Sequence, residues 1–187
     1  TDQAILGIID GSKALRKGLK DLFGKKVLIH RCQEHKLRNV LSHLPKKYHL
    51  EVKRRLRAAY KMNDYAKALE AIGSLLSYLD RLNESAAASL REGMEETLTV
   101  HKLGLPDMLR RSLVTTNLIE SAFSRYRDVT RNVKRWSTDD QKRRWTATAL
   151  LEAQRSFKRV KGFRSMSVLI AAVEHEVIKE ERQAQAA

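Results

Sequence analysis

The start of the chain switches from a continuous apolar run to helical spacing and back. Residues 4–9 form an unbroken apolar run, which is typical of a strand buried on both faces. Apolar side chains then recur at helical intervals over residues 12–23, and Gly24 follows in the position of a C-cap. A shorter apolar run at 27–29 indicates a second strand. This order predicts a β-α-β unit with two parallel strands and a right-handed crossover.

From residue 33 onward the apolar positions follow helical periods. The expected helices lie at about 33–44, 52–60, 64–79, 83–98, 117 onward, 137–160 and 165–181. Pro106 interrupts residues 105–116, which are expected to form a return loop, and residues 183–187 to form a frayed tail. The pattern predicts an α/β fold that is mostly helical overall.

Short polar residues mark where two of these helices begin. Asn63 or Asp64 is expected to cap one helix, and Asn83 or Ser85 the next. Hydrophobic residues make up 42% of the 187, and there are only eight Gly and two Pro. The chain therefore fits one ordered domain, or one core that carries a large insertion.

The charge is strongly positive and unevenly distributed. The net charge is +15, with nine Lys/Arg against one acid in residues 36–62 and thirteen against four acids in 125–164. Residues 63–107 carry four basic and eight acidic residues. Two basic blocks separated by an acidic stretch favour a polyanionic partner that is bound by one interrupted surface.

The cysteine count, the lengths of the apolar stretches and the first residues indicate the compartment and the origin of the chain. Cys32 is the only cysteine, so no internal disulfide can form and a reducing cytoplasm is compatible. No apolar stretch reaches the roughly 18–20 residues that span a bilayer, and no signal peptide is apparent. There is no initiator Met, and the first strand follows Thr1 almost directly, so we expect the chain to come from the middle of a longer polypeptide.

Asp10 follows the first strand directly and precedes Gly11. A carboxylate at the carboxyl end of a buried strand is held rigidly and can bind a hard cation. The alternative is that Asp10 and Gly11 form a turn or cap the following helix. The strand alone leaves both interpretations open.

A second acid, Glu120, stands near an expected helix start in the segment Thr115-Thr116-Asn117-Leu118-Ile119-Glu120. It could be a metal ligand on the first turn, with the two threonines bonding backbone or phosphate. Asn117 and Glu120 also have the spacing of a capping box, in which Glu folds back onto the amide of the N-cap residue. Spacing does not separate the two hypotheses.

Cys32 and His35 are three residues apart and share a face if a helix begins there. Cys-x-x-His is half of a zinc site, yet neither His30 nor His43 supplies a second pair with ligand spacing. A nucleophilic Cys-His pair lacks an orienting partner. We favour a buried thiol hydrogen-bonded to His35.

The basic blocks mix cations with aromatic rings, as in proteins that neutralise phosphates and stack on bases. The candidate DNA-binding residues are Lys53, Arg54, Arg55, Arg57, Arg125, Arg127, Arg131, Lys134, Arg135, Arg143 and Arg144. Trp136 and Trp145 could stack on bases, or they could be core residues beside a solvated charged face.

The order I-I-D-G, a helix, V-L-I-H-R-C-Q-E-H-K-L-R-N-V, a helical stretch and T-T-N-L-I-E-S resembles the Mutator-like transposases of bacterial insertion sequences. The resemblance extends from Ile5 to about Val177. It implies the C-terminal catalytic part of a DDE-type transposase: a partial ribonuclease H-like fold with few parallel strands and a large α-helical insertion. The implied segments are a β-α-β-α part of the core at 1–44, the insertion at 45–110, and helices that return to the core at 111–187.

By this resemblance Asp10 matches the second Asp and Glu120 the Glu of the catalytic triad, both as ligands of two Mg²⁺ (or Mn²⁺) ions. The positions that match the structural signature are Cys32, His35, Arg38, Asn39, Thr115, Thr116 and Asn117. The first Asp belongs to an earlier strand, and Asp2 is too close to Asp10 to supply it. We therefore expect this chain alone to be inactive.

The implied function is metal-dependent strand cleavage and transfer of an insertion element. The partners would be DNA, as transposon ends and target, and further copies of the protein as a homo-oligomer, without membrane. The location would be the bacterial cytoplasm, at the nucleoid when DNA is bound. Two alternatives are a non-catalytic basic helical module that binds DNA or RNA, and a ribosome- or RNA-associated basic protein, which only the charge supports.

Overall fold

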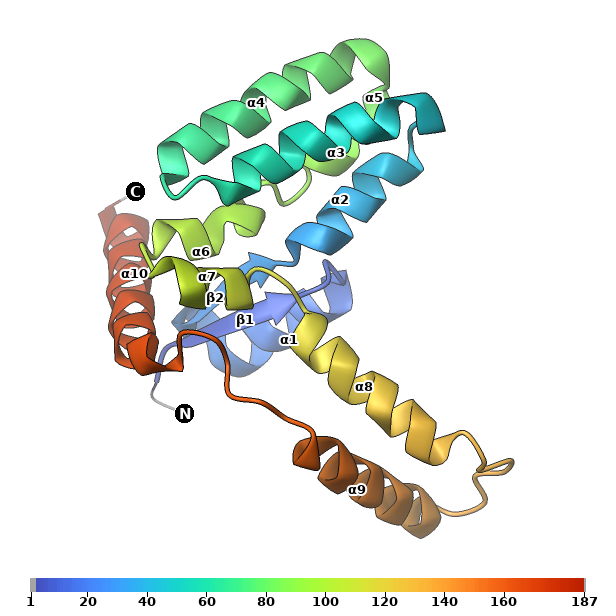
Figure 1. The fold of residues 1–187 in the computed structure, drawn as a ribbon. Coiled ribbons are helices and arrows are strands. Elements are labelled where there is room, and N and C mark those ends of the chain that lie inside the picture. The colour runs from blue at the N-terminus through green and yellow to red at the C-terminus, as the bar shows by residue number, and fades with distance from the viewer. Residues whose placement is uncertain (1–2, 187) are drawn as a thin grey trace. The chain divides into compact units, whose positions relative to one another are not determined.

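The chain begins with the expected β-α-β unit in the computed structural model, which describes residues 3–186 and so leaves Asp2 and Ala187 outside the description. Strands β1 (Ile5–Ile9) and β2 (Val27–Arg31) pair in parallel, with Ile5 opposite Val27 (Figure 1). Between them lie α1 (Lys13–Phe23) and the short 3₁₀ helix η1 (Gly24–Lys26). The parallel pair is thereby confirmed.

Local signals set the ends of α1. The Ser12 hydroxyl accepts a hydrogen bond from the Leu15 amide, which is the bonding of an N-cap. Gly24 takes a positive φ of 58° at the other end, and its N–H bonds the Lys20 carbonyl. The helix therefore begins and ends where its cap residues stand in the sequence.

Alternation along the strands divides the core between two faces of the sheet. Ile9, Val27 and Ile29 pack on one face with Leu19 and Phe23 of α1. On the other face, Leu28 packs with apolar residues of the segment 100–105 and of α10 (Met166–Ala186). Because successive strand side chains point to opposite faces, this small sheet is covered on both sides.

The two strands differ from the sequence expectation in burial and length. Every residue of β2 is buried, and the strand extends to Arg31, two residues beyond the predicted run, because His30 and Arg31 pair with Ile8 and Ile9 of β1. In β1 only Gly7 and Ile9 are buried, so the expectation of burial on both faces was wrong for that strand. Within the described residues β1 pairs with β2 alone, which leaves its other edge less covered.

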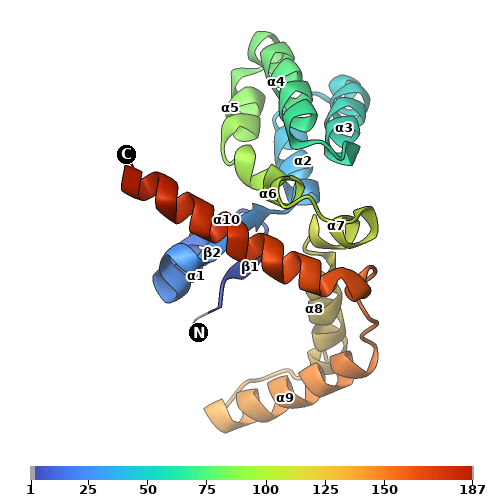
Figure 2. The same cartoon turned by 90° about the vertical axis from the view of Figure 1, so that its left-hand side faces the viewer.

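A helical cluster follows the sheet and has its own core. Its helices are α2 (Gln33–Ser42), α3 (Lys46–Lys61), α4 (Tyr65–Leu82) and α5 (Glu84–Arg91). The predicted stripes fill its interior, with Val40, Val52, Leu56 and Ile72 fully buried. In both views α3 and α4 run side by side (Figures 1 and 2). Asp64 and Asn83 are the N-caps, as the sequence allowed.

The helix expected from Asn83 to Leu98 was wrong as a single element. It ends at Arg91, and the chain turns at Gly93, whose φ is +62°. The 3₁₀ helix η2 (Glu95–Leu98) and α6 (Thr99–Lys102) follow. The expected return loop also differs, because α7 (Asp107–Leu113) begins right after Pro106, a residue that fits the start of a helix.

The remaining helices agree with the sequence in place and differ in length. They are α8 (Asn117–Thr130), α9 (Asp139–Arg155), the 3₁₀ helix η3 (Phe163–Ser165) and α10. The predicted 137–160 helix starts at the Thr138 cap and ends at Arg155, because the Ser156 amide bonds the carbonyls of the last turn. The expected frayed tail is helical as far as Ala186.

The chain forms two compact units. One contains the residues up to Thr115 and from Lys161 onward, and the other is Thr116–Val160, in which α8 packs on α9. The division into residues 1–44, 45–110 and 111–187 stays a prediction. No helix in residues 3–186 has the length and apolar character that crossing a membrane requires.

Candidate functional site

Asp10 stands in an exposed turn directly after β1. Its Oδ1 accepts a hydrogen bond from the Ser12 amide at 2.9 Å, and the intervening Gly11 has a φ of +104°. The Asp10-Gly11 turn of the sequence analysis is therefore present. The carboxylate is nevertheless exposed at the carboxyl end of a strand, so the turn and a role as cation ligand are compatible.

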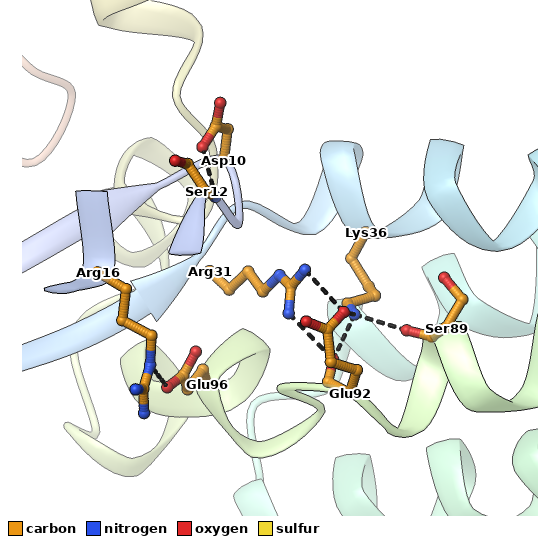
Figure 3. A network of polar contacts seen from close by, with 8 residues as sticks. All are labelled: Asp10, Ser12, Arg16, Arg31, Lys36, Ser89, Glu92 and Glu96. Atoms are coloured by element: carbon orange, nitrogen blue, oxygen red, sulfur yellow. Dashed lines mark hydrogen bonds and ion pairs between the residues drawn. The ribbon is translucent and has the colours of Figure 1, made fainter. Parts of the chain in front are cut away.

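Arg31, at the end of β2, packs against this turn from inside the molecule. Its Nη2 donates to the Glu92 carboxylate at 3.1 Å and its Nη1 to the Glu92 carbonyl at 3.2 Å. A Cβ atom at Gly11 would lie 2.5 Å from Arg31 Nε, and one at Gly93 would lie 2.6 Å from Nη1. The two glycines thus leave the space that the guanidinium occupies, with Asp10 pointing away from it (Figure 3).

Lys36 completes this network from α2. Its side chain is fully buried, and Nζ donates to the Ser89 carbonyl at 2.6 Å and to the Glu92 carbonyl (Figure 3). These carbonyls belong to the end of α5, where a helix leaves its last acceptors unpaired. Burial lowers the pKa of Lys36 to about 8, and the Arg31 hydrogen bond lowers the pKa of Glu92. The turn after α5 is therefore tied to both β2 and α2.

A groove of about 830 Å³ opens beside the Asp10 turn. One wall is α1 and the other is the turn after α5, and Arg16 joins the two by an ion pair with Glu96 at 2.7 Å. The lining residues are Ile9, Gly11, Lys13, Arg16, Lys17, Lys20, Asp21, Arg31, Arg91, Glu92, Gly93, Met94, Glu95 and Glu96. The end of β1 thus borders a groove that carries six cationic and four acidic side chains.

Glu120 lies on the first turn of α8 and is partly buried. The Thr116 hydroxyl donates to Glu120 Oε1 at 2.5 Å. The predicted capping box was wrong in its register, because Thr116 is the N-cap and Asn117 is an exposed first helical residue. Thr115 is half-buried and ends the other compact unit. Asp10 and Glu120 belong to different units, and their convergence stays a prediction.

Cys32 and His35 form the expected hydrogen-bonded pair. The thiol has no exposed surface, and His35 Nδ1 lies 3.2 Å from Cys32 Sγ. The Cys32 amide also continues the sheet, donating to the Ile9 carbonyl at 2.7 Å. Within residues 3–186 no group of three His, Cys, Asp or Glu side chains is placed to hold a metal ion. The structural role of the pair stays a prediction. Arg38 and Asn39, the next two signature positions, are exposed on α2.

The candidate DNA-binding residues of α3 are exposed, and most of them are engaged within the molecule. Arg54 and Arg55 both bond Glu51, at 3.0 and 2.5 Å. Arg57 bonds Glu34 at 3.0 Å, whereas Lys53 makes no ion pair with a described residue. Three of the four candidate cations on α3 are therefore engaged in ion pairs, with two acids between them.

The second basic block is exposed on α8, on α9 and on the loop between them. Arg144 pairs with Asp140 at 2.9 Å. The other candidates make no ion pair with residues 3–186; they are Arg125, Arg127, Arg131, Lys134, Arg135 and Arg143. Trp136 and Trp145 are each 37% exposed, so the alternative that they are core residues was wrong.

Comparison with known families identifies the chain. A family model described as "Transposase, Mutator family" matches residues 1–160. The chain belongs to the Mutator family of transposases. The match includes both acidic segments and confirms the resemblance that the motifs gave. In searches of curated proteins and of solved structures, this Mutator-family chain finds no match.

Two features of the site were missed by sequence reasoning. The cations of α1 had a visible signal, since residues 13–26 contain six Lys/Arg and one acid. The network of Arg31 and Lys36 had no such signal. Charged side chains are ordinarily exposed, and only the fold buries these two.

Proposed function

We propose that this chain is the catalytic part of a DNA transposase that cleaves and transfers strands with the help of divalent metal ions. The observation that carries the proposal is the Mutator-family match over residues 1–160, which spans Asp10 and Glu120. The exposed carboxylate at the end of β1 supports it. So does the helical stretch between the two acids, which fits an insertion into a ribonuclease H-like core.

The donor chemistry fits Mg²⁺ in kind, since hard divalent cations prefer carboxylate oxygens. It is incomplete in number, because the described residues gather no group of three such ligands. Asp10 and Glu120 are the residues that would hold the ions, and bound Mg²⁺ would supply activation of the attacking oxygen and stabilisation of the leaving oxygen. The chain's own contribution is orientation: Ser12 and Thr116 each donate a hydrogen bond to one acid.

DNA is the substrate that the charge supports. The unpaired cations of the α8–α9 unit can neutralise phosphates, and the partly exposed Trp136 and Trp145 offer ring surface for bases. A homo-oligomer acting on paired transposon ends, in the bacterial cytoplasm, completes the proposal.

The test uses the protein that contains this chain in a strand-transfer assay with Mg²⁺. Asp10→Asn and Glu120→Gln should each lower strand transfer by about 100-fold or more, because changes even beyond the metal ligands cost about 10–100-fold. Both variants should still bind DNA. The matched control is Glu70→Gln, an exposed acid on α4, which should keep full activity. Near-normal transfer by either site variant overturns the ligand assignment.

The second candidate is a basic helical module that binds DNA or RNA without catalysis. The observation that favours it is the same incomplete ligand set beside well-exposed cations. It predicts that the wild-type protein binds nucleic acid without strand transfer. Asp10→Asn and Glu120→Gln should then leave that binding unchanged. Metal-dependent strand transfer by the wild type excludes it.

A further inference from the structure

The α1 wall of the groove beside Asp10 carries a regular row of cations. Lys13, Lys17 and Lys20 are spaced by four and three residues, so they lie along one face of the helix. All three are exposed, and all three line the groove. No ion pair joins any of them to a residue between 3 and 186. None of the three lysines is held in an ion pair by the described residues, although the charge of Lys13 also acts on the Glu92 carboxyl from a distance.

The acids of the groove, by contrast, are mostly neutralised by other groups. Glu92 bonds Arg31, and Glu96 bonds Arg16. Glu95 has Lys102 at 3.9 Å. Among the described lining residues, Asp21 is the remaining acid without an ion pair. The groove therefore presents three lysines outside any ion pair with the described residues against one such acid and will attract an anion.

The length of the row fits a chain of phosphates. Seven residues of α-helix extend for about 10 Å, at about 1.5 Å per residue. One DNA strand carries a phosphate about every 3.4 Å along the axis of the duplex. That length contains about three such intervals, so the three lysines lie along a run of about four successive phosphates.

The lining also indicates which part of a nucleic acid would bind. None of the residues that line the groove is aromatic, so no ring is available to stack on a base. Arg31 and Gly11 place one end of the groove beside the Asp10 turn. A strand held by its phosphates along α1 would therefore lead to that turn, whose carboxylate points away from Arg31 (Figure 3).

We propose that the Lys13–Lys17–Lys20 face of α1 binds the phosphate backbone of DNA and directs it toward Asp10. The proposal rests on the function proposed above and adds a contact surface outside the two basic blocks. Its recognition is by charge and spacing, and it carries no sequence specificity.

The test is a triple variant of the intact protein, Lys13→Gln with Lys17→Gln and Lys20→Gln. Gln keeps a similar helix propensity, so α1 should stay folded, and an unchanged thermal midpoint checks this. The matched control removes the same charge from exposed cations of α4 and α10, outside the two basic blocks: Lys67→Gln with Arg81→Gln and Lys179→Gln. Binding of a short transposon-end duplex is measured by fluorescence anisotropy over a range of NaCl.

Loss of three phosphate contacts should reduce the slope of log K against log[salt] by about 2 to 3, and the control should keep the wild-type slope. Equal slopes for the two triple variants overturn the proposal, because they show a general effect of net charge. Tighter binding of duplex RNA than of DNA, with the same dependence on these lysines, overturns DNA as the occupant.

A tethered probe tests the location independently. Cys32 is buried, so Lys17→Cys gives one accessible thiol in this chain for an iron-EDTA label. Cleavage of the bound duplex should concentrate within a few nucleotides of the strand-transfer position, and uniform cleavage overturns the direction toward Asp10. An active Asp10→Asn variant would remove the proposed catalytic role, whereas the salt slopes would still decide whether α1 contacts DNA.

Discussion

Arg31 donates two hydrogen bonds to Glu92, one to its carboxylate at 3.1 Å and one to its backbone carbonyl at 3.2 Å. The bonds join the end of β2 to the turn after α5, two segments 61 residues apart in the chain. The same guanidinium fills the space left by Gly11, the residue after Asp10. One side chain therefore fixes both the candidate catalytic turn and the far wall of the groove.

Removal of this side chain should destabilise the fold. Arg31→Ala leaves Glu92 without its main partner and opens a space in the interior, and we expect a loss of about 2–3 kcal/mol in the free energy of unfolding. Arg91→Ala is the control, since its ion pair with Asp80 is exposed and worth less than about 1 kcal/mol. Urea unfolding of both variants measures the difference, and equal midpoints would contradict the role given to Arg31.

Gly93 and Gly73 should respond in opposite directions to Ala. At Gly93 the positive φ and the contact with Arg31 both oppose a side chain, so Gly93→Ala should cost at least about 1–2 kcal/mol. Gly73 lies inside α4 with open space where a Cβ would be, so Gly73→Ala should add about 0.5–1 kcal/mol. Thermal unfolding midpoints should move down for the first and up for the second. A rise for Gly93→Ala would show that the turn is not fixed as described.

His30 should make the fold sensitive to acid. Burial lowers its pKa from 6.5 to about 4, so between these pH values the unfolded chain binds more protons than the folded one. The stabilisation that the neutral, buried His30 gives to the folded state is complete above pH 6.5. It is lost as the pH falls toward 4, and the free energy of unfolding decreases by up to about 3 kcal/mol. Urea unfolding of the wild type and of His30→Gln should diverge over this range. The control is the exposed His43→Gln, which should follow the wild type; parallel curves for all three proteins would refute the assignment.

The two basic blocks should contribute unequally to DNA binding. Arg54, Arg55 and Arg57 must give up ion pairs with Glu51 and Glu34 before they can bind phosphate. Changing all three to Gln should therefore weaken binding less than Gln at the three unpaired cations Arg127, Arg131 and Arg135. Anisotropy titrations at one salt concentration compare the two triple variants. A larger loss from the α3 variant would mean that its ion pairs open readily on DNA.

Cys32 should be unreactive while the protein is folded. Its thiol is fully buried beside His35, so a thiol reagent should modify it only after unfolding. Cys32→Ser should keep strand transfer and lose stability, because a hydroxyl replaces a buried thiol. Rapid labelling of the folded protein would reopen the nucleophilic interpretation.

Local signals predicted the β-α-β unit well. The strands, the Ser12 cap and Gly24 follow from side-chain period and cap chemistry, which act over a few residues. The same reasoning failed at Gly93, where Leu90, Met94 and Leu98 continue a helical period that the chain does not follow. The turn there is fixed by Arg31, and no local pattern contains that contact.

Some features of the candidate site could be predicted from the sequence, and others depend on the fold. The position of Asp10 after a strand, the pairing of Cys32 with His35 and the family motifs could all be predicted from the sequence. The bond from Thr116 to Glu120 could not, because the sequence allowed Asn117 as the cap and the fold selected Thr116.

By itself, the sequence determined the order of strands and helices, the acid at the end of β1 and the membership of the Mutator family. Only the tertiary structure decided which cations are engaged inside the molecule and which reach solvent. Arg16 forms an ion pair with Glu96, and Arg31 forms one with Glu92, at sequence separations of 80 and 61 residues. Lys13, Lys17 and Lys20 stay exposed. Charge pairing depends on distance in space, and sequence spacing determines that distance only within one element.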